Sequence, residues 1–146
     1  MFDTILGLPM HPLVVHGVVV LLPLMALVTV LVAARKGPRE RWAWVVAVLD
    51  LGLVGMALVA KESGEALQRR LGVNVEAHEE IAEKLPLTAA ALFGAAVLVA
   101  LTRTNRRVGP IAVMLTMVAA IGVLWMTFRA GHTGAEAVWG SVVGAK

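Results

Sequence analysis

The sequence predicts an all-α integral membrane protein that forms one four-helix bundle over residues 1–146, and two observations predict it. Hydrophobic residues make up 59% of the chain and charged residues only 16%, whereas soluble domains carry roughly 25% charged residues. The chain also contains four apolar segments of about 20 residues, the length that a helix needs to cross the hydrocarbon layer. A soluble chain this short could not bury so much apolar surface in one core.

The four helices are expected at residues 12–34, 42–60, 76–101 and 110–128, with a longer polar connection at residues 61–84. Helices are the expected form because only they satisfy every backbone hydrogen bond within one lipid-exposed segment. The second helix is expected to extend to about Gly64, and Gly72 is expected to break the connection. Ala77, Ile81 and Leu85 have helical spacing, so the third helix should start outside the membrane.

Basic residues gather in the two short loops and predict the orientation. The first loop carries Arg35, Lys36, Arg39 and Arg41, and the second carries Arg103, Arg106 and Arg107. Positively charged loops face the cytoplasm, so both termini and the long connection are expected on the non-cytoplasmic side. The first segment is interpreted as a retained anchor, because its apolar run is too long for a signal peptide. The net charge of +3 mostly reflects topology, and we expect no nucleic-acid partner.

The four histidines, His11, His16, His78 and His132, all fall on the predicted outer side at similar depth. A single histidine at a membrane interface is most often an ordinary hydrogen-bonded surface residue. His16, however, is expected at the edge of the hydrocarbon, where a polar group is costly and usually has a partner. The set is therefore a candidate binding site for a cofactor or a metal.

The spacing of the histidines limits how they could share a ligand. His11 and His16 are five residues apart, which places them about 140° around a helix and about 7.5 Å along it. Two pairs of imidazoles would suit b-type haem (heme b) held between facing helices. A single cluster would instead suit zinc or copper, with help from nearby carboxylates. The candidate carboxylates are Glu62, Glu65, Glu79 and Glu136.

Asp50 lies near the middle of the second predicted helix, where an ionised acid is expensive. One interpretation is a proton relay or a quinone contact. The favoured interpretation is a protonated acid that hydrogen-bonds across the bundle to a threonine such as Thr29, Thr88 or Thr116.

Several motifs resemble one known family. The run His11-Pro12-Leu13-Val14-Val15-His16, the segments 63–65 and 78–79, and the tail at 132–144 are similar to the bacterial membrane family called domain of unknown function 2231. This chain departs from the family pattern at Gly17, Ala135 and Trp139. Members that resemble it occur fused to Rieske-type or cytochrome-like redox domains. The resemblance covers the whole chain and implies a multi-pass protein of the bacterial inner membrane that takes part in electron transfer.

The leading hypothesis is a membrane cytochrome that passes electrons between a quinone oxidoreductase and an external carrier such as a Rieske or cytochrome c type protein. The alternatives are an outer-face divalent metal-binding protein and a non-catalytic accessory subunit. We expect an electron carrier or subunit rather than a stand-alone enzyme, since no motif for catalysis is present. The lipid bilayer is an expected partner, and association into a homo-oligomer stays open.

Overall fold

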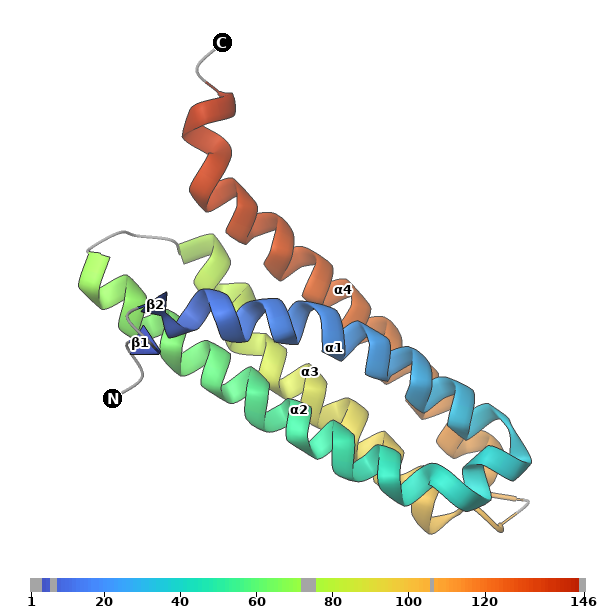
Figure 1. Ribbon diagram of the computed structural model, residues 1–146. Coiled ribbons are helices and arrows are strands. Elements are labelled where there is room, and N and C mark those ends of the chain that lie inside the picture. Colours follow the sequence, from blue (N-terminus) through green and yellow to red (C-terminus); the bar gives the residue numbers. More distant parts are fainter. Residues whose placement is uncertain (1–3, 6–7, 72–75, 106, 145–146) are drawn as a thin grey trace.

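The computed structural model describes residues 4–5, 8–71, 76–105 and 107–144. Four long helices form a bundle: α1 (Met10–Ala34), α2 (Lys36–Leu71), α3 (Glu76–Leu101) and α4 (Gly109–Val143) (Figure 1). Two very short strands, β1 (Thr4–Ile5) and β2 (Leu8–Pro9), pair antiparallel just before α1. All four helices are long and apolar enough to cross a membrane. The predicted all-α membrane bundle is confirmed.

Each helix packs against two main neighbours. The α1 helix contacts α2 and α4 extensively, α3 also contacts α2 and α4, and α1 touches α3 only slightly. The order around the bundle is therefore α1, α2, α3, α4. This arrangement brings the starts of α1 and α3 to the same end of the bundle as the last turns of α2 and α4. The final part of α4 extends beyond the other helices (Figure 1).

Small side chains dominate the interior of the bundle. Among the described residues, eleven buried alanines are less than 7% exposed, and they let neighbouring helices approach closely. Larger side chains, including Leu22, Leu92 and Val123, fill the centre of the main core. Large apolar side chains such as Val48, Leu87 and Phe128 point outward. An apolar exterior around an apolar core is what a bundle in lipid requires.

Two helices are longer than their predicted apolar spans. The α2 helix begins at Lys36 and continues through Gly64 to Leu71, and α4 continues to Val143. Hydropathy detects only the part of a helix that matches the membrane, whereas these extensions are polar or mixed. In α2, Glu65 lies 3.5 Å from both Lys61 and Arg69 on adjacent turns, which supports an exposed helix. The expected break at Gly72 lies outside the described residues, as does Arg106.

The orientation of the bundle can be tested with single cysteines, because the chain has none. Glu40 and Glu136 are exposed near opposite ends of the bundle. If the basic loops face the cytoplasm, a membrane-impermeant maleimide will label the Glu136→Cys variant in intact cells. The Glu40→Cys variant will then react only after the membrane is opened. The reverse pattern would overturn the predicted orientation.

Candidate functional site

All four histidines lie toward one end of the bundle, which we call the histidine end. This end contains the starts of α1 and α3 and the last turns of α2 and α4 (Figure 1). We call the opposite end, formed by the turn between α1 and α2 and the loop between α3 and α4, the basic end. The structure brings two of the histidines inward and leaves two at the surface.

His11 is half-buried between α1 and α2. Its Nδ1 atom lies 3.0 Å from the carbonyl oxygen of Ala60 and 3.3 Å from Ser63 Oγ. Because a carbonyl can only accept, Nδ1 carries the proton, and Nε2 keeps its lone pair. The ring packs so closely on Gly64 that a Cβ atom there would lie 2.8 Å from His11 Cε1. Glycine at residue 64 is therefore what allows the ring to sit between the two helices.

His78 makes an equivalent contact between α3 and α4. Its Nδ1 atom lies 3.2 Å from Thr133 Oγ1 and also hydrogen-bonds to the backbone of Ala130. Thr133 donates its own hydroxyl proton to the carbonyl of Arg129, at 3.0 Å, so it accepts from His78 Nδ1. The ring lies against Gly134, where a Cβ atom would be 3.2 Å from His78 Cε1. The Nε2 atom of His78 again keeps its lone pair.

The two half-buried imidazoles lie at the same end of the bundle, one in each pair of consecutive helices. Each contributes its Nδ1 atom to a contact with the neighbouring helix, which leaves Nε2 as the atom that can bind a metal.

The other two histidines are exposed and make contacts within their own helices. His16 Nδ1 contacts the carbonyl oxygen of Pro12, one turn earlier in α1. His132 stacks on Phe128, with ring centroids 6.1 Å apart, and its Nε2 atom lies 3.3 Å from Glu136 Oε1. The structure thus does not bring His16 and His132 to the pair formed by His11 and His78.

The candidate carboxylates are engaged elsewhere or lie apart from the histidine pair. Glu79 accepts a hydrogen bond of 3.0 Å from Gln68 Nε2, and Glu65 pairs with Lys61 and Arg69. Glu62 is exposed. Within the part of the chain that the structure describes, no three His, Asp or Glu side chains are grouped so that they could hold a metal ion.

Asp50 is buried in the bundle, with only 1% of its surface exposed. Thr29 Oγ1 lies 2.9 Å from Asp50 Oδ2 and 2.7 Å from the carbonyl oxygen of Met25. A hydroxyl has one proton, so if Thr29 donates it to Met25, the contact with Asp50 requires a protonated carboxyl that donates to Thr29. Of the three threonines considered as partners, Thr29 is the one in contact, because Thr88 and Thr116 bond to carbonyls of their own helices.

Asp50 is not part of the histidine end. It precedes Ala60, the residue whose carbonyl holds His11, by ten positions in α2, which is about 15 Å along the helix. Its Oδ1 atom is buried and has no hydrogen-bond partner among the described residues. A neutral acid tolerates this position far better than a carboxylate would.

Comparison with known protein families gives a match over most of the chain. The pattern of a family described as "Predicted membrane protein (DUF2231)" matches residues 7–146. The chain belongs to this family. The matched residues include all four helices and all four histidines of the chain. No curated protein and no solved structure matches the chain.

The contact between Gly64 and His11 predicts that adding a methyl group at residue 64 lowers the stability of the protein. Replacement Gly64→Ala would force the His11 ring to move, and we expect a loss of about 1–3 kcal/mol in stability, as is typical of overpacking. Gly131→Ala is the matched control, since nothing lies within 4 Å of a Cβ atom at that position of α4. Thermal unfolding in detergent, followed by circular dichroism, measures both. Equal stabilities of the two variants would contradict the proposed packing.

The protonated state of Asp50 also predicts a pair of outcomes. If Thr29 donates to Met25 and Asp50 is protonated, Asp50→Asn should leave the melting temperature nearly unchanged, because the amide can donate to Thr29 Oγ1 in place of the carboxyl. Thr29→Val should lower stability by about 1–3 kcal/mol, because it leaves the buried acid without its partner. If Asp50→Asn were as harmful as Thr29→Val, a neutral Asp50 would be ruled out.

Proposed function

We propose that this chain is an electron-transfer protein of the bacterial inner membrane that binds b-type haem at the histidine end, with His11 and His78 as the axial ligands. One observation carries the proposal. The two half-buried imidazoles lie at the same end of the bundle, and each is held through Nδ1 by the next helix along the chain. Each ring therefore has an Nε2 atom able to bind a metal.

The hydrogen bonds at Nδ1 are typical of histidines that serve as metal ligands. Such histidines usually donate their second N–H to a carbonyl, carboxylate or water, which fixes the tautomer and the orientation of the ring. His11 does so with the Ala60 carbonyl, and His78 does so with Ala130 and Thr133. The ligands would thus be oriented before any cofactor binds.

The donor set favours haem over zinc. Two neutral imidazoles are a complete axial set for a b-type haem, whereas zinc sites use three or four protein ligands. When bound, the haem supplies a centre that gains or loses one electron. The chain supplies one ligand from the hairpin of α1 and α2 and one from the hairpin of α3 and α4. Gly64 and Gly134 allow both rings to lie close to the neighbouring helix.

The site lies at the histidine end of a membrane bundle. This position suits exchange of electrons with partners in the membrane and outside it. A quinone oxidoreductase would be the membrane partner, and a Rieske or cytochrome c type protein would be the external one. The similarity to proteins fused to redox domains supports this choice. His16 and His132 are exposed at the same end and could contact such a partner.

The absorption spectrum of the purified protein tests the proposal. Protein from haem-replete cells should show a Soret band, which His11→Ala and His78→Ala should each abolish. His16→Ala and His132→Ala are the matched controls and should keep the band, because their side chains are exposed and contact only residues of their own helices. A colourless wild-type protein, or equal loss of the band in all four variants, would overturn the assignment.

Divalent metal binding is the second candidate function, and the contact between His132 and Glu136 favours it. The two side chains lie on successive turns of α4, with Nε2 3.3 Å from Oε1, and an imidazole with a carboxylate can supply two of the three or four ligands of a zinc site. Elemental analysis of the same preparation discriminates the two functions. Stoichiometric zinc or copper without iron, lost in Glu136→Gln, would select metal binding.

A further inference from the structure

The basic end of the bundle contains a pocket of about 220 Å³ between the start of α2 and the loop that joins α3 to α4. Its walls combine cationic and polar side chains with a single acid. The lining residues are Lys36, Arg39, Glu40, Arg103, Thr104 and Asn105. None of the three cations forms an ion pair with an acidic side chain among the described residues. With three cations and one acid in its lining, the pocket has a positive net charge.

Arg39 is the cation whose position calls for a ligand. Its side chain is half-buried and packs on the first residue of α4, so that a Cβ atom at Gly109 would lie 3.2 Å from Arg39 Nη1. Its Nε atom is buried and has no hydrogen-bond partner in the described part of the chain. A buried donor that lacks an acceptor is costly, and the cost is larger for a charged group. An anion in the pocket would offset this cost by pairing with the guanidinium that carries the Nε atom.

Two other side chains are already oriented as donors. Arg103 Nη1 donates 2.9 Å to the carbonyl of Ala100, which holds the guanidinium at the end of α3. Asn105 Oδ1 accepts from the backbone N–H groups of Arg107 and Val108, and its amide nitrogen is left as a donor. The pocket therefore offers guanidinium, ammonium and amide donors, a set that suits phosphate oxygens.

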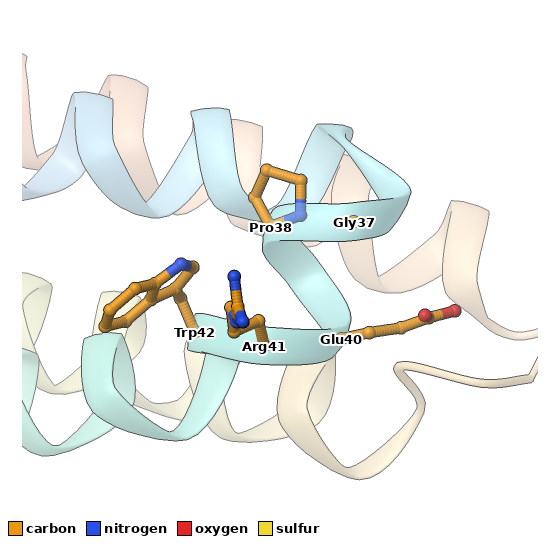
Figure 2. A pocket seen from close by; sticks show the side chains of 5 residues that line it. All are labelled: Gly37, Pro38, Glu40, Arg41 and Trp42. Carbon is orange, nitrogen blue, oxygen red and sulfur yellow. The ribbon is translucent and has the colours of Figure 1, made fainter.

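A second, more open hollow of about 530 Å³ lies at the start of α2 and shares the lining residue Glu40 with the first. Figure 2 shows Trp42 and Arg41 lying beside Pro38, while the Glu40 side chain points away from them. Trp42 is 50% exposed, and tryptophan is enriched where a membrane meets water. A charged pocket next to a hollow with an apolar wall fits a molecule with an anionic head and an apolar body.

We propose that the basic pocket binds the phosphate group of an anionic phospholipid, with Lys36, Arg39 and Arg103 around the phosphate and Trp42 with Pro38 against the lipid body. Basic pockets at helix ends are a common way for membrane proteins to bind such lipids. Topology explains why cations are placed in these loops, but it does not explain the unpaired Nε of Arg39. The proposal is independent of haem binding, which concerns the opposite end.

Native mass spectrometry of the full chain in detergent, with added phosphatidylglycerol, tests this site. Arg39→Gln and Arg103→Gln should each weaken lipid retention about tenfold, as expected from the loss of a charged hydrogen bond. Arg39→Lys keeps the charge and should retain more lipid than Arg39→Gln. Glu40→Gln removes the repelling acid and should strengthen retention. Arg69→Gln, which removes an exposed cation near the histidine end, is the matched control and should change nothing.

The same experiment can overturn the proposal in three ways. Equal retention by Arg39→Gln, Arg103→Gln and Arg69→Gln would show that the lipid does not use this pocket. Phosphatidylcholine retained as strongly as phosphatidylglycerol would exclude selection for an anionic lipid. Displacement of the lipid by inorganic phosphate would assign the pocket to free phosphate instead. Circular dichroism of each variant confirms that it is folded.

Discussion

The structure depends on one constraint, which is that backbone N–H and C=O groups inside a lipid bilayer must be hydrogen-bonded within the chain. Four helices meet this constraint across the membrane, so most polar side chains are restricted to the two ends of the bundle. Buried alanines let the helices pack closely. Asp50 is an exception to this division, and its contact with Thr29 is what makes a buried acid tolerable.

The two halves of the bundle use the same contact at the histidine end. In the first hairpin, His11 packs on a serine-glycine pair of α2, and in the second, His78 packs on a threonine-glycine pair of α4. In each case the hydroxyl and a nearby carbonyl hold Nδ1, and the glycine gives the ring room. This equivalence makes the two imidazoles a matched pair, which is the physical basis for the proposed axial ligation.

The two ends of the protein differ in chemistry because their charges differ. The basic end carries cations around a pocket that form no ion pair with an acid among the described residues. The histidine end holds the half-buried imidazoles of His11 and His78, and its extended helix α2 carries charged residues that pair with one another. Phosphate recognition suits the first environment, and coordination by Nε2 suits the second. The roughly 15 Å between Asp50 and the carbonyl that holds His11 separates the buried acid from the proposed cofactor site.

Hydropathy and length were enough to determine the membrane class, the number of helices and the start of the third helix at residue 76, because these follow from local properties of each segment. The sequence also placed the four histidines at one end. Only the tertiary structure divided them into the inward pair His11 and His78 and the exposed His16 and His132. That division depends on how each helix is rotated against its neighbours. The rotation is set by packing between residues more than 50 positions apart, such as His11 and Ser63, and no local pattern in the sequence reports it.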